Sequence, residues 1–172
     1  LNADSLMSYP DFRSFEHAFQ VLAQVSGRAG RRNTSGKVIV QTYQPKHEAL
    51  KYVVGNQYAA MFESQMEERR RFLYPPFCRL IKVTLKHSDE ECLNKAAAVL
   101  ATPLNEAFPQ QVLGPAFPPV ARIQNYFLKD FWLKLPKNAN LSDKKRILAG
   151  ILLDVQSLPV FRNVKVIVNV DC

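Results

Sequence analysis

Residues 80–91 read LIKVTLKHSDEE, and this stretch contains the two patterns that decide the fold. Apolar and polar residues alternate from Leu80 to Lys86, which is typical of a half-buried β-strand. One face of that strand would carry Ile81, Val83 and Leu85, and the other would carry Lys82, Thr84 and Lys86. The following Ser88-Asp89-Glu90-Glu91 has the spacing of a capping box, which predicts the start of a helix.

Both patterns recur towards the end of the chain. The helix that starts at the capping box would bury Leu93, Ala97, Leu100 and Leu104, with a kink or early end at Pro103. A short strand is expected at 112–115 and the longest one at 126–135. Ser142 would cap a second helix whose inward residues are Ile147, Leu148, Ile151, Leu152 and Val155. A final strand alternates through Val164, Val166, Val168 and Val170.

The resulting order is β-α-β-β-α-β. With both helices on one face of an antiparallel sheet, this is the ferredoxin-like arrangement. Residues 77–172 are therefore predicted to form an α+β domain. The stiff Tyr74-Pro75-Pro76-Phe77 segment before it marks a domain boundary, because consecutive prolines exclude a helix.

Residues 47–76 are expected to be a helical connector. A short helix over 47–54 would end at Gly55-Asn56, and a longer helix would follow and end near Arg69-Arg70-Arg71. Arg69 and Arg70 are candidates for contact with DNA phosphates. The alternative is a solvated last turn, where cations interact favourably with the helix dipole.

Residues 24–32 read QVSGRAGRR and end an amphipathic run that contains Phe12, Phe15, Phe19 and Leu22. Arginine binds phosphate oxygens in a bidentate manner, and glycine allows a ligand to approach closely. The stretch could therefore face a phosphate. Alternatively, it is an ordinary helix end with glycines and cations.

Val38-Ile39-Val40 is a continuous apolar run, typical of a strand buried on both faces of a parallel sheet. One helix and one strand cannot complete such a sheet, so we expect residues 1–46 to be the end of an α/β lobe with exposed apolar surface.

Composition limits the possible functions. The 172 residues carry a formal net charge of +8, which favours an anionic partner, with nucleic acid the natural one. No apolar run is long enough to span a membrane.

The three cysteines lack the spacing of a zinc site or a disulfide framework, so we expect no metal and a reducing, cytoplasmic location. Neither a complete phosphate-binding loop nor a D-E-x-x box occurs, so we expect no ATPase activity from the chain alone.

The form Q-x-x-G-R-x-G-R at 24–31 resembles motif VI of superfamily 2 helicases. Taken with its flanks, it resembles the PriA (primosomal protein N′) family of bacterial replication-restart helicases over essentially the whole chain. The flanking stretches are LNADSL (1–6), YPDFRS (9–14), VIVQTY (38–43), YPPF (74–77), GP (114–115) and VNVD (168–171). Because the chain starts at Leu1 inside such a motif, we expect a C-terminal fragment in which 1–46 is the end of a RecA-like second helicase lobe.

The resemblance implies roles for residues of this lobe. Arg28 and Arg31 would point into the cleft between two ATP-binding lobes, where one or both would reach the γ-phosphate of ATP as arginine finger. Gln24 would lie near the attacking water or an adjacent phosphate. Asp4, Gly27 and Gly30 would belong to the nucleotide-binding surface, although Asp4 could instead cap a helix or a turn. The full-length protein would use ATP with Mg²⁺, and the zinc module of the family lies outside this segment.

The implied function is that of the C-terminal part of an ATP-dependent 3′ to 5′ DNA helicase. Such a helicase recognises stalled or branched replication forks and restarts replication by primosome assembly. Its partners would be branched and single-stranded DNA, single-strand-binding protein and primosome proteins. The alternative is a stand-alone nucleic-acid-binding or protein-assembly module with a ferredoxin-like fold.

Four lysines on the faces of the predicted sheet are DNA-binding candidates, or else they only keep an exposed face solvated: Lys82, Lys86, Lys129 and Lys134. Trp132 is expected to pack in the core or between sheets, and the alternative is a platform on which bases stack. Many family members have alternating arginine and aromatic residues and then glutamine at the strand occupied here by Tyr126–Asp130, near the surface that binds the tail of single-strand-binding protein. This chain lacks that arginine and glutamine, so the role does not transfer residue by residue.

Overall fold

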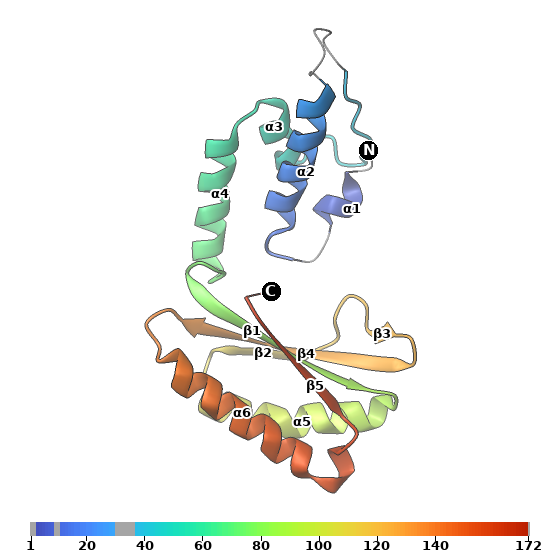
Figure 1. The fold of residues 1–172 in the computed structure, drawn as a ribbon, viewed down its shortest axis with the longest axis vertical. Coiled ribbons are helices and arrows are strands. Elements are labelled where there is room, and N and C mark those ends of the chain that lie inside the picture. The colour runs from blue at the N-terminus through green and yellow to red at the C-terminus, as the bar shows by residue number, and fades with distance from the viewer. Residues whose placement is uncertain (1–2, 9–10, 30–36, 172) are drawn as a thin grey trace. The chain divides into compact units, whose positions relative to one another are not determined.

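The computed structural model describes residues 3–8, 11–29 and 37–171. These residues form two compact units, 1–72 and 73–172, each described here by itself (Figure 1). In the described residues, no helix combines the length and the apolar character that a membrane crossing requires.

The second unit is built on one antiparallel sheet. Its strands are β1 (Cys78–His87), β2 (Val112–Ala116), β3 (Arg122–Ile123), β4 (Tyr126–Pro136) and β5 (Lys165–Val170). The order across the sheet is β2-β4-β1-β5, with the short β3 paired to β4. Without the two-residue β3, this is the predicted β-α-β-β-α-β order, and every pairing is antiparallel. The ferredoxin-like prediction is confirmed.

Two helices cover the same face of this sheet, α5 (Glu90–Ala107) and α6 (Leu141–Ser157), as Figure 1 shows. A one-turn 3-10 helix, η1 (Pro159–Phe161), follows α6. The core between sheet and helices contains Ile81, Val83, Leu85, Leu93, Leu100, Leu104, Phe131, Leu133, Leu135, Leu148 and Leu152. Each such side chain contributes about 1.5–3 kcal/mol when it is fully buried, so this core holds the sheet and the helices together.

The helix starts differ from the predictions by one or two residues. Asp89, rather than Ser88, caps α5, because its carboxylate accepts a hydrogen bond from the Cys92 N–H at 3.0 Å. Asn140, rather than Ser142, caps α6. Pro103 does not end its helix, since α5 continues to Ala107.

One predicted inward residue of α6 faces solvent. Leu148 and Leu152 are buried, but Ile147 is 41% exposed. Each helical residue is turned by about 100° from the one before it, so Ile147 falls outside the narrow stripe that contacts the sheet.

The first unit is helical in its described residues. It contains α1 (Asp4–Met7), α2 (Ser14–Ala29), α3 (Glu48–Val54) and α4 (Tyr58–Arg71). A small core joins Ala3, Leu22 and Leu50, with Met7, Val40 and Val53 packed against it. Because α3 contributes to this core, the helices of the expected connector 47–76 belong to the first unit and do not form a separate segment.

The strand predicted at Val38-Ile39-Val40 is wrong for the described residues. This segment is irregular, and Ile39 is 75% exposed. A strand needs hydrogen-bonding neighbours for its backbone groups. Just after this segment, the Gln41 carbonyl accepts a hydrogen bond from the Ala3 N–H at 3.0 Å. The expected exposed apolar surface is present, since Tyr43 is also 91% exposed.

Candidate nucleic-acid interface

The sheet of the second unit has one face that neither α5 nor α6 covers (Figure 1). Val83 and Phe131 pair across β1 and β4 and lie in the core, so the alternate residues of both strands project to the opposite side. We call this side the open face. Its charged and aromatic members are Lys82, Lys86, Tyr126, Asp130, Trp132, Lys134 and Lys165.

Aromatic rings support the lysines of the open face. Lys86 Nζ and Lys165 Nζ lie 4.4 and 5.1 Å from the centre of the same ring, that of Tyr126. Lys82 Nζ lies 5.0 Å from the centre of the Trp132 ring. Cation–π contacts of this kind hold the ammonium groups in place while leaving their outer sides available. Trp132, expected in the core, is thus a half-buried residue of the open face.

Asp130 neutralises part of this charge. Its carboxylate is buried, accepts the Thr84 hydroxyl at 2.6 Å and lies 2.8 Å from Lys82 Nζ. A buried carboxylate needs such partners, because removal from water would otherwise be costly. The charge of Lys82 therefore already has a partner, whereas Lys86 and Lys165 make no ion pair within the part of the chain that the structure describes.

The four lysines predicted to bind DNA do not share one face. Lys129 pairs with Leu85, a core residue, and its Nζ lies 4.6 Å from the centre of the Phe117 ring. Lys134 is on the open face, 4.0 Å from the centre of the Tyr74 ring, and burial lowers its pKa below the ordinary lysine value. An odd spacing between 129 and 134 already implies opposite sides of a strand.

Sequence reasoning missed Lys165. Pairing of β1 with β5 places it directly opposite Lys86, a relation that only the sheet register reveals. The signal that could have found it is the valine alternation at 164–170, which turns the residue at 165 away from the core.

The described residues of the stretch that resembles helicase motif VI lie near the C-terminal end of α2. Gln24, Gly27 and Arg28 are all exposed there, and the Arg28 side chain makes no ion pair or hydrogen bond within the described residues. Gln24 and Arg28 are four residues apart and so share a side of the helix. Gly30 and Arg31 lie outside the described residues.

Asp4 connects two segments of the first unit. Its carboxylate accepts the Thr42 hydroxyl at 2.7 Å and the Tyr43 N–H at 3.0 and 3.1 Å. The Asp4 oxygens therefore hold residues 42–43 against the start of α1.

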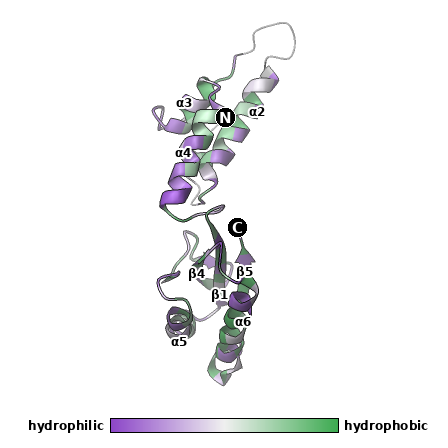
Figure 2. Ribbon diagram, turned by 90° about the vertical axis from the view of Figure 1, so that its left-hand side faces the viewer, coloured by the Kyte–Doolittle hydropathy of each residue, from purple (hydrophilic) through white to green (hydrophobic). Residues whose placement is uncertain are grey.

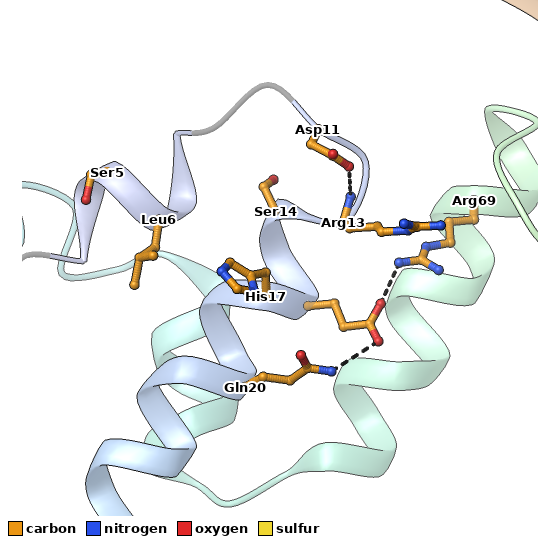
Figure 3. A pocket seen from close by; sticks show the side chains of 9 residues that line it. Ser5, Leu6, Asp11, Arg13, Ser14, His17, Gln20 and Arg69 are labelled. Carbon is orange, nitrogen blue, oxygen red and sulfur yellow. Dashed lines mark hydrogen bonds and ion pairs between the residues drawn. The ribbon is translucent and has the colours of Figure 1, made fainter. Parts of the chain in front are cut away.

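Arg69 also has a local partner, beside a cavity of about 630 Å³ (Figure 3). From α4 its Nη2 reaches Glu16 of α2 at 2.7 Å, and its side chain is only 14% exposed. Gln20 donates to the same carboxylate at 3.4 Å. Arg69 thus joins α4 to α2, and Arg70 is the more accessible of the two predicted DNA contacts, in the hydrophilic end of α4 (Figure 2).

Comparison with known proteins adds independent findings. The family model described as the primosomal protein N C-terminal domain matches residues 70–172. Replication restart protein PriA of Bacillus subtilis is 37% identical over 144 residues, which is 83% of this chain and 18% of that protein. The PriA of Synechocystis is 35% identical over 78% of this chain and 16% of the relative. The PriA of Haemophilus influenzae is 31% identical over 99% of this chain and 23% of the relative. The chain therefore spans less than a quarter of the length of these relatives.

Proposed function

Because this chain belongs to the PriA replication-restart family, we propose that it serves as the C-terminal part of an ATP-dependent 3′ to 5′ DNA helicase. The whole protein would recognise stalled or branched forks in the bacterial cytoplasm and restart replication by primosome assembly. Branched and single-stranded DNA, single-strand-binding protein and primosome proteins would be its partners.

The open face is the observation that supports DNA binding by this part of the protein. Lys86 and Lys165 present two ammonium groups beside one tyrosine ring, without a carboxylate partner in the described residues. Basic groups interleaved with aromatic rings suit a single strand, whose phosphates attract cations. We propose that these lysines contact phosphates, with Lys134 at the other end of the face and Lys82 restrained by Asp130.

The test is fluorescence anisotropy with a labelled oligothymidylate of about 20 nucleotides, titrated between about 50 and 200 mM salt. Affinity should fall as salt rises. Replacing Lys86 and Lys165 together by glutamine should weaken binding and reduce the slope of log K against log salt by about 1.4, since each lost single-strand phosphate contact removes about 0.7.

The matched control is the double change Lys95→Gln and Lys145→Gln. It alters the net charge equally, but both residues are exposed on α5 and α6, the helices that cover the other face. It should leave the slope within about 0.3 of wild type, because neither residue is expected to contact phosphate. Equal losses in both double variants would contradict the proposed interface and indicate a general charge effect.

The exposed end of α2 supports the helicase part of the proposal. We propose that Gln24, Gly27 and Arg28, with Gly30 and Arg31, face ATP and Mg²⁺ held by another lobe, where arginine stabilises charge on the transferred phosphoryl group. This chain alone should show no ATPase activity, because it lacks a phosphate-binding loop and a D-E box.

The corresponding experiment uses the longer protein with both lobes. Arg31→Ala should reduce DNA-stimulated ATPase turnover by about 10³-fold or more, in the range known for arginine fingers. Unchanged turnover would favour the competing function, a nucleic-acid-binding or assembly module without a catalytic contribution from this chain.

A further inference from the structure

A second, polar recess lies next to the open face at one end of the sheet. Its cavity of about 700 Å³ is bounded by the end of β1, the start of β4, the end of α6 and the turn that leads into β5. The polar lining residues are His87, Ser88, Tyr126, Gln156, Arg162, Asn163 and Lys165. Arg162 lies in this recess. It is neither one of the α2 residues proposed to face a nucleotide nor one of the four lysines predicted to bind DNA.

The chemistry of the lining favours an anion. Arg162 and Lys165 supply permanent positive charge, and hydroxyl and amide groups supply further donors. The described lining contains no carboxylate. The nearest acidic residue in sequence, Asp89, is already used, because its carboxylate caps α5 through the Cys92 N–H. Its N–H donates to His87 Nδ1 at 3.1 Å, which orients the imidazole at the rim.

The sheet register places two cations side by side at this recess. Lys86 and Lys165 are directly opposite each other on β1 and β5, and both lie over the ring of Tyr126. Like charges at opposed positions destabilise a sheet unless something compensates them. No carboxylate pairs with either one within the described residues, so an external anion would relieve this repulsion.

We infer that this recess binds a phosphate group of a nucleic-acid strand that also contacts the open face. This inference rests on the proposed DNA binding and names a specific subsite for it. Arg162 would bind two phosphate oxygens, Lys165 would approach from the β5 side, and Ser88 and Asn163 would donate to the remaining oxygen atoms. The phosphate could be a terminal one or one within the strand, and the experiment separates these two sources.

The experiment titrates the whole chain with two hexathymidylates, one with a 5′-phosphate and one with a 5′-hydroxyl, and follows backbone amide shifts by NMR. Signals of Ser88, Asn163 and Lys165 should move with either probe. Arg162→Gln should weaken binding about tenfold, since a hydrogen bond to a charged group is lost. The Arg162 side chain is exposed and makes no hydrogen bond or ion pair within the described residues, so this variant should melt like wild type.

Arg146→Gln is the matched control. Arg146 is near the start of α6 and pairs with Asp143, whereas the recess lies at the other end of that helix. It should bind both probes like wild type. A preference for the 5′-phosphate that Arg162→Gln abolishes would support a terminal phosphate, and an equal loss with both probes would support an internal one.

Two results would overturn the inference while leaving the proposed function intact. One is wild-type affinity of Arg162→Gln for both probes, with the salt-dependent binding by Lys86 and Lys165 preserved. The other is Arg162-dependent binding of an acidic hexapeptide with no Arg162-dependent binding of either oligonucleotide. Loss of all salt-dependent DNA binding in the wild-type chain would instead contradict the proposed function itself.

Discussion

Asp130 is a buried carboxylate that holds Lys82 of the open face in place. Its carboxylate, 4% exposed, lies below Lys82 and accepts the Thr84 hydroxyl. Asp130 therefore fixes a lysine and contributes to the electrostatics of the open face without being accessible itself.

Replacing Thr84 by valine keeps the shape of the side chain and removes the donor to Asp130. The buried carboxylate then loses a partner, and the free energy of unfolding should fall by about 1–3 kcal/mol. Urea unfolding measures this change. Thr102→Val, at an exposed position of α5, is the control and should change stability by less than about 0.5 kcal/mol. Equal effects of the two substitutions would show that the Thr84–Asp130 hydrogen bond contributes nothing.

Gly114 is required by backbone geometry. Its φ is +113°, and an added Cβ would lie 2.6 Å from the Asp130 carbonyl oxygen. Gly114→Ala should lower the free energy of unfolding by about 1–3 kcal/mol or more, through strain and this overlap. Gly150, in α6 with open space around it, is the matched control, and its change to alanine should stabilise the protein by up to about 1 kcal/mol. Chemical denaturation of both variants measures the difference, and a stable Gly114→Ala protein would contradict this account.

At the scale of the element, helix α5 begins at a cap that can gain or lose a proton, the carboxyl group of Asp89. The Cys92 N–H bonded to Asp89 is the main cause that lowers the pKa of this carboxyl below its ordinary value of about 3.9. The folded state therefore favours the ionised cap. Its stabilising effect is fully present above the unfolded pKa and is lost as pH falls through the lower, folded one.

Asp89→Asn retains an oxygen that can cap the helix but does not titrate. Wild type should melt at a higher temperature than this variant at pH 6, and the difference should shrink as pH falls below about 4. Thermal denaturation by circular dichroism between pH 2 and pH 7 measures it. A difference that stays constant over this range would mean that ionisation of the cap has no effect on the stability of α5.

At the scale of the whole molecule, two cores stabilise two units. One core is centred on Leu22, and the other contains Leu100 among many fully buried side chains. Compact units with separate cores tend to open as separate cooperative blocks. The first unit has the smaller core and many exposed apolar residues, so it should have the lower free energy of unfolding.

Leu22→Ala and Leu100→Ala should each destabilise their own unit by about 2–5 kcal/mol. Hydrogen exchange followed by mass spectrometry should show faster exchange in peptides of α2 and α3 for the first variant, and in peptides of β1 and β4 for the second. Faster exchange throughout the chain in both variants would instead show one cooperative block.

The sequence by itself determined the element order of residues 77–172, because strand alternation and helix periodicity are local patterns that can be read within each segment. It also determined the family, through motifs in a characteristic order. It did not determine that residues 38–40 are irregular, or which of two nearby polar residues caps each helix, because both depend on the backbone geometry of the folded chain.

Only the tertiary structure decided which charges act together. Pairing of β1 with β5 placed Lys165 beside Lys86, packing placed Glu16 beside Arg69, and strand parity separated Lys129 from Lys134. Such relations join residues far apart in the chain, and no local pattern encodes them. The physical reason is that register and packing are properties of neighbouring elements, which come together only when the apolar faces of both are buried.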